Sequence, residues 1–153
     1  MPTLSRPAAY SLAIVLLALA SFGESLAQQA ASAWPTMARV TFTKEYDELL
    51  GLKVDKPVFS EAVRALNGET VTLRGYVIPT EGYKSHKEFV FSAYPYASCF
   101  FCGGAGPETV VEVLAKAPIA YSADAVTLTG KLVLNSEDPN ALMYRLEEAT
   151  LLD

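Results

Sequence analysis

The sequence predicts a mainly β domain with a few helices: a five-stranded Greek-key barrel of the OB-fold type that carries an N-terminal strand and helix extension. Three observations predict this fold. Two stretches of alternating apolar residues, 71–78 and 125–134, each contain an internal glycine, as expected for strands that bend around a barrel. A helix is expected between the third and fourth strands. Strong turn residues at 136–140 separate the last two strands.

The extension is expected to precede the barrel. Val40 and Phe42 alternate as in a short strand, and Trp34 is expected to pack on the core. A helical segment from Pro57 to Gly68 follows, with Ser60 as its N-cap.

The barrel strands are expected to follow the extension in order. Gly75 in the first of them predicts either a bulge or a close approach of another chain segment. A bend at Pro95 separates the second strand from the third. The expected strands are 71–78, 89–95, 99–101, 125–134 and 142–152, although the propensities of the last one also suit a helix. A helix is expected to begin near Pro107 and to be stopped by Pro118.

The N-terminus predicts a cleaved secretory signal peptide, residues 1–27. Arg6 precedes a largely apolar run from Ala8 to Phe22, and Ser25-Leu26-Ala27 fits the small-x-small rule of signal peptidase. The run is shorter than the roughly 18 to 20 residues that span a bilayer, so we expect no transmembrane segment after cleavage. Residues 28–153 are expected to form a single OB-like domain, exported to the periplasm or the extracellular space.

The balance of charges argues against a nucleic-acid partner. The chain has 12 lysines and arginines against 17 aspartates and glutamates, a net charge of −5. Such a surface repels phosphate backbones, and no cluster of basic residues stands out. We therefore expect a protein or a metal ion as the partner.

The most distinctive chemistry lies in a Cys-x-x-Cys motif, Cys99 and Cys102, which three glycines follow. An oxidising compartment favours a local disulfide or a structural thiol pair. The same two thiolates would supply half of a tetrahedral zinc site or nearly all of a linear Cu(I) site. His86 and Glu108 are the candidates for additional ligands. A third interpretation is thiol redox chemistry, favoured by a helix start close to the cysteines.

Geometry limits how the two cysteines can act together. Side chains three residues apart in a regular strand point to opposite faces, so a shared ion or disulfide requires a bend between Cys99 and Cys102. The glycines that follow make this bend possible. If the pair acts together, both sulfurs are expected on one side of a turn.

The known catalytic motifs do not support an enzyme. The chain has one histidine and lacks Gly-x-Ser-x-Gly, a P-loop and a dinucleotide fingerprint. His86-x-Glu88 before the cysteines differs from the zinc deaminase signature in its spacing and in the residue before Cys99. We therefore expect a non-enzymatic binding module that uses the cysteine segment for a soft metal ion or a partner interface. The alternative is a thiol–disulfide oxidoreductase.

The segments GETVTLRGYVIP and EFVFSAYPYASCFFCGGAGPETVVEV resemble a family of small secreted bacterial proteins, a domain of unknown function associated with the Bacteroidetes. The stretch CFFCGGAGPE is the most specific part of the resemblance. The resemblance implies an exported OB-like domain. It implies no established activity, so no catalytic residue is carried over from it.

Overall fold

The structure is a computed structural model, which describes residues 32–48, 51–79, 82 and 84–152. The chain divides into two units, 1–31 and 32–153, and the description concerns the second. The predicted signal peptide and the expected mature start at Gln28 lie outside the described residues.

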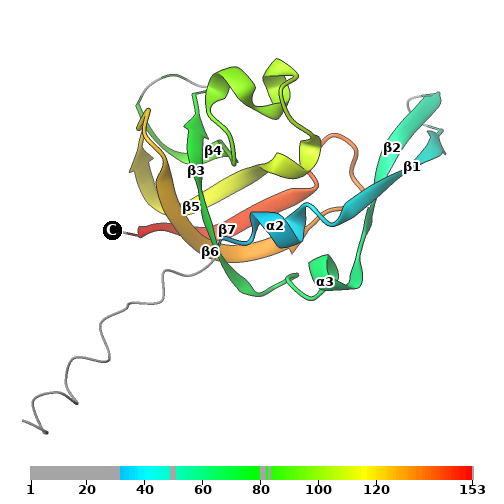
Figure 1. The fold of residues 1–153 in the computed structure, drawn as a ribbon, viewed down its shortest axis with the longest axis horizontal. Coiled ribbons are helices and arrows are strands. Elements are labelled where there is room, and N and C mark those ends of the chain that lie inside the picture. Colours follow the sequence, from blue (N-terminus) through cyan, green and yellow to red (C-terminus); the bar gives the residue numbers. More distant parts are fainter. Residues whose placement is uncertain (1–31, 49–50, 80–81, 83, 153) are drawn as a thin grey trace, which may run out of the picture. The chain divides into compact units, whose positions relative to one another are not determined.

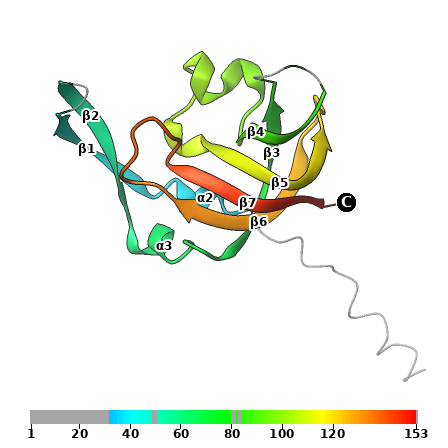
Figure 2. The ribbon, with the colours of Figure 1, turned by 180° about the vertical axis from the view of Figure 1, so that it is seen from behind.

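Five strands of the second unit close into a barrel in the order β3-β4-β5-β7-β6 (Figure 1). Neighbouring strands pair antiparallel except β5 and β7, which are parallel and lie side by side in Figure 2. This closed, mixed barrel with short helices confirms the predicted fold class. The strands are β3 (Thr70–Ile78), β4 (Ser85–Ser92), β5 (Val110–Ala120), β6 (Val126–Leu134) and β7 (Tyr144–Leu152).

The barrel interior is filled by the alternating apolar side chains of its strands. In β3, Leu73 is fully buried while its neighbour Arg74 is exposed, which is the period-two pattern predicted for this strand. Gly75 lies where β3 passes the end of β4, so the prediction of a close approach is confirmed. The largest fully buried side chains of the barrel are those of Leu73, Ile78, Phe91, Val110, Val111, Val113, Leu128, Leu132, Tyr144 and Leu146.

The extension is a hairpin with a short helix on either side in sequence. These elements are α2 (Trp34–Met37), β1 (Val40–Asp47), β2 (Leu52–Phe59) and α3 (Glu61–Arg64). Ser60 caps α3 as predicted, because its hydroxyl accepts a hydrogen bond from the Val63 amide at 3.4 Å. Pro57 does not begin the helical segment: it lies in β2 opposite Phe42 of β1. The helical segment therefore begins four residues later than predicted, at Glu61.

Helix α2 packs onto the barrel. Met37 is fully buried, and Trp34 is partly buried against the core, as predicted. The Trp34 indole donates a hydrogen bond to the Arg74 carbonyl at 3.0 Å, and the Tyr144 hydroxyl donates to the Met37 carbonyl at 2.7 Å. These bonds join α2 to β3 and β7.

Two predicted elements between β4 and β5 are wrong. Residues 99–101 form no strand, and the helix expected to begin near Pro107 and to end before Pro118 is absent. Three 3₁₀ turns occupy this region: η2 (Tyr96–Ser98), η3 (Phe100–Cys102) and η4 (Pro107–Thr109). The β-branched residues from Val110 onward belong to β5 because they pair with β4 and β7 on both sides.

The two α-helices among the described residues, α2 and α3, have only four residues each. The residues between β5 and β6, 121–125, contain no helix. In the part of the chain that the structure describes, no helix has the length and apolar character needed to cross a membrane.

Candidate functional site

The cysteines lie in the loop that joins β4 to β5, residues 93–109, seen as the pair of short coils above the barrel in Figure 1. The loop is closed at its base, where the Ala93 amide donates to the Thr109 carbonyl at 2.9 Å. Ser92, which is fully buried, accepts a hydrogen bond from the Tyr94 amide at 3.1 Å. The loop is thus anchored to the end of the β4–β5 ladder.

A tight turn separates Cys99 from Cys102. The Cys99 carbonyl accepts hydrogen bonds from the amides of Cys102 at 3.1 Å and Gly104 at 3.2 Å. Gly103 has a φ of 78°, a left-handed conformation that glycine adopts at low cost. At Gly104 an added Cβ would lie 2.7 Å from the Ser98 carbonyl oxygen, so the chain has no room for a side chain there. The glycines therefore make the bend that a shared cysteine site requires.

Both thiols are free, but their exposure differs. Cys99 is fully buried and Cys102 is exposed. The turn η3, closed by the hydrogen bond from the Cys102 amide to the Cys99 carbonyl, brings these two residues to the same side of the chain. The pKa of Cys102 is raised, first by partial desolvation, and then by a hydrogen bond and a charge interaction with Cys99. The Cys102 thiol is also expected to remain protonated at neutral pH.

The other two candidate ligands are not part of this pair. His86 lies in β4 opposite Ile119, six residues and therefore about 20 Å along the strand from Ser92, where the cysteine loop begins. The Glu108 carboxylate lies over Gly106 and is close enough to Tyr144 to raise its pKa. Among the described residues, no group of three or more His, Cys, Asp or Glu side chains is placed to hold a metal ion.

Three large aromatic side chains of the cysteine loop are exposed to solvent. Tyr94, Tyr96 and Phe101 are 48%, 59% and 52% exposed. Phe89 and Phe91, which precede them in β4, are buried in the core as expected. Exposed aromatic side chains are enriched at interaction surfaces.

A groove of about 690 Å³ lies between the β1–β2 hairpin and the β6–β7 loop, residues 135–143. Phe100, which sits between the two cysteines in sequence, and Pro107 line it from the cysteine loop. The groove therefore brings together three segments that are far apart in the chain. Its size is within the usual range for ligand sites.

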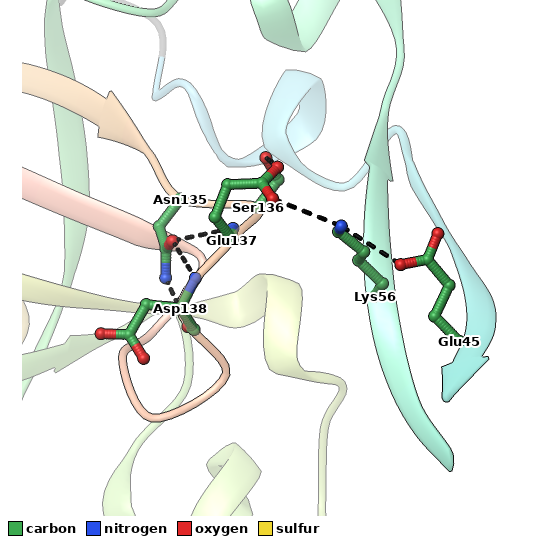
Figure 3. Close-up of polar contacts among 6 residues, drawn as sticks. All are labelled: Glu45, Lys56, Asn135, Ser136, Glu137 and Asp138. Atoms are coloured by element: carbon green, nitrogen blue, oxygen red, sulfur yellow. Dashed lines mark hydrogen bonds and ion pairs between the residues drawn. The ribbon is translucent and has the colours of Figure 1, made fainter. Parts of the chain in front are cut away.

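Lys56 joins the hairpin to the β6–β7 loop across this groove (Figure 3). Its Nζ lies 3.2 Å from a carboxylate oxygen of Glu45 and 3.4 Å from one of Glu137. The pKa of Lys56 is raised by its hydrogen bond to Glu45 and then by Glu137. The pKa of Glu137 is lowered, first by the hydrogen bond from Ser136 and then by Lys56. All these charges are in contact with solvent, so the ion pairs add little stability.

Asn135 organises the β6–β7 loop. Its side-chain oxygen accepts hydrogen bonds from the amides of Glu137 at 3.1 Å and Asp138 at 3.0 Å (Figure 3). Its side-chain nitrogen donates to the Asp138 carbonyl at 2.8 Å and to the Leu142 carbonyl at 3.3 Å. This one side chain holds both ends of the loop.

We expect Asn135→Ala to lower the free energy of unfolding by about 1 to 2 kcal/mol, because the loop loses several hydrogen bonds to one side chain. Urea unfolding followed by circular dichroism measures this change. Asn140→Ala, at an exposed position of the same loop, is the matched control and is expected to change the stability less. Equal losses in the two variants would contradict the role given to Asn135.

The sequence predicted the turn at 136–140 but not the groove, because its other wall is a hairpin that was not predicted. The exposed aromatic residues Phe42 and Tyr46, four apart in β1, are the signal that could have indicated it.

Comparison of the chain with protein-family models, with curated proteins and with solved structures found no match in any of the three.

Proposed function

We propose that the protein is an exported, non-enzymatic binding module in which Cys99 and Cys102 together bind one soft metal ion, Cu(I). The observation that supports this proposal is the tight turn between the two cysteines, which the hydrogen bond from the Cys102 amide to the Cys99 carbonyl closes. The contribution of Cys99 to the raised pKa of Cys102 agrees with it. Thiolates are the ligands that Cu(I) prefers, and two of them are nearly sufficient for it. Exposure of Cys102 gives an ion a route to the pair.

Zinc fits the same pair less well. A structural zinc site has four ligands in a tetrahedron, and the described residues supply the two sulfurs without a third or fourth donor beside them. A zinc ion would need the rest of its ligands from a partner. Cu(I) does not have this requirement.

Thiol–disulfide exchange is also less well supported than metal binding. Exchange begins with attack by a thiolate, and the raised pKa of Cys102 lowers the fraction of that thiolate at neutral pH. The helix start that would stabilise a thiolate is replaced by the three-residue turn η4, Pro107–Thr109. A bound metal, in contrast, displaces the thiol protons itself.

The test is an anaerobic titration of the reduced, signal-cleaved protein with Cu(I) in competition with a chromogenic chelator. We expect one ion per chain, and affinities at least about tenfold weaker in both Cys99→Ser and Cys102→Ser, since even loss of an outer-shell partner weakens metal sites 10- to 100-fold. Ser98→Ala is the control from the same turn. It is expected to bind as the wild type does.

Two results would contradict the proposal. Wild-type affinity in both serine variants would show that copper binds elsewhere. Catalytic reduction of insulin disulfides that depends on Cys102, without stoichiometric copper binding, would favour the oxidoreductase instead.

A further inference from the structure

The groove between the hairpin and the β6–β7 loop is acidic. Five carboxylates line it, those of Glu45, Asp47, Asp55, Glu137 and Asp138. Lys56, which also lines the groove, is engaged by Glu45 and Glu137 (Figure 3). Asp55 pairs at 3.0 Å with Lys44, which lies outside the lining. The carboxylates of the groove therefore outnumber the two lysines that pair with them.

The lining between these charges is apolar and partly aromatic. Phe42 is 38% exposed and Tyr46 is 64% exposed, and both belong to the same strand of the hairpin. Phe100 adds a third aromatic ring from the cysteine loop. Aromatic side chains in a partly desolvated site contribute most of the binding energy in many interfaces.

The hairpin also offers backbone hydrogen-bonding groups. β1 and β2 pair along eight residues each, and in the described ranges neither strand pairs with any other. β2 contains Pro57, which lacks an N–H group, whereas β1 contains no proline. The outer edge of β1 can therefore accept an additional extended strand.

We propose that this groove binds an extended, cationic peptide segment of another protein. Lysine or arginine side chains of the segment lie against the acidic rim, an apolar side chain contacts Phe42 and Tyr46, and its backbone pairs along the edge of β1. The proposal does not depend on the cysteine pair, although Phe100 is common to the groove and the cysteine turn.

The charges also argue against two other occupants of the groove. A second copy of the chain would bring a net charge of −5 to an acidic groove. Residues 1–31 contain one arginine and one glutamate, so they carry no net charge with which to fill it. Complementary potentials set which partners a surface accepts, and this surface selects for cations.

Removal of Lys56 is expected to raise the affinity of the groove for the peptide. A peptide cation and Lys56 compete for Glu45 and Glu137, so removal of Lys56 frees two carboxylates for the peptide. Lys56→Met keeps the length and the apolar part of the side chain. We expect this variant to bind the peptide more tightly than the wild type, by about threefold for one charge.

The experiment measures fluorescence anisotropy of a labelled eight-residue peptide in which lysine and valine alternate around one central phenylalanine. Each removed rim charge, in Glu45→Gln or Asp55→Asn, is expected to weaken binding about threefold. Tyr46→Ser is expected to weaken it about tenfold. Asp124→Asn and Tyr94→Ser, which remove a charge and an exposed aromatic ring outside the groove, are the matched controls and are expected to have no effect.

Three outcomes would overturn the proposal. The first is equal binding of a peptide with glutamate in place of lysine. The second is spermine, a cation without a peptide backbone, binding as tightly as the peptide. The third is weaker binding by Lys56→Met. The measurement is repeated on metal-free protein that carries both Cys99→Ser and Cys102→Ser, where retained binding supports the groove independently of the copper proposal.

Discussion

Gly75→Ala is expected to lower the free energy of unfolding by about 3 kcal/mol or more, the upper part of the range for overpacked cores. An added Cβ would collide with the carbonyl oxygen of Ser92 and lie 3.2 Å from the ring of Phe91. Both are rigid parts of β4, and Phe91 is fully buried. β3 and β4 would have to separate at Gly75, the residue at which β3 stops pairing with β6 and begins to pair with β4.

The measurement is urea unfolding followed by far-UV circular dichroism, with folded protein first verified by its near-UV spectrum. Gly51→Ala is the matched control: its Cβ would meet nothing within 4 Å, but its φ of 67° is unfavourable for alanine. It is expected to cost about 1 to 2 kcal/mol, the usual penalty of the left-handed conformation. A Gly75→Ala loss no larger than that of Gly51→Ala would show that β3 and β4 can separate easily.

The barrel strands were predictable because burial leaves a periodic signal in the sequence. Side chains of β3 alternate between the core and the surface, so Val71 and Leu73 mark the strand without any structure. Gly75 inside this pattern predicted either a bulge or a close approach, and the structure shows the close approach to Ser92. Gly130 is the equivalent in β6, where an added Cβ would lie 2.8 Å from the Glu147 carbonyl oxygen.

The hairpin left a weaker signal. Val40 and Phe42 indicated the start of β1, but every side chain from Thr41 to Tyr46 is exposed, so the sequence shows no buried face from which the full strand or its partner β2 can be inferred. Pro57 reinforced the error, since proline is more common at helix starts than within strands. One wall of the groove was therefore not predictable from hydrophobic periodicity.

The segment after the cysteines shows a different kind of error. Pro107 and Glu108 suit a helix start, but the next residues are valines that β4 and β7 draw into the sheet. The helix-start residues therefore form only the 3₁₀ turn η4, because the strand pairing of the valines ends the helical conformation after three residues. The sequence predicted a bend between Cys99 and Cys102 only for the case that the two cysteines act together, because two side chains three apart cannot meet on a straight strand. The turn η3 takes the place of the strand expected at 99–101.

Tyr144→Phe is expected to lower the free energy of unfolding by about 1 to 2 kcal/mol at neutral pH. The hydroxyl of Tyr144 donates a 2.7 Å hydrogen bond to the Met37 carbonyl, and both residues are fully buried. Phenylalanine would keep the ring in place, including its 5.8 Å contact with Phe59, and leave the Met37 carbonyl without this donor. Helix α2 would lose its hydrogen bond to β7.

The same residue makes the protein sensitive to alkali. Burial, and then the charge of Glu108, raises the pKa of Tyr144 far above its ordinary value of about 10. Above about pH 10 the unfolded chain releases this proton while the folded protein keeps it, so stability is fully present below that pH and falls by up to about 1.4 kcal/mol per pH unit above it.

Urea midpoints measured from pH 8 to 11 should show a shallower alkaline decline in Tyr144→Phe than in the wild type. Tyr46→Phe, at a side chain that is 64% exposed, should decline as the wild type does. Parallel pH profiles for wild type and Tyr144→Phe would mean that the hydroxyl titrates as freely in the folded barrel as in the unfolded chain.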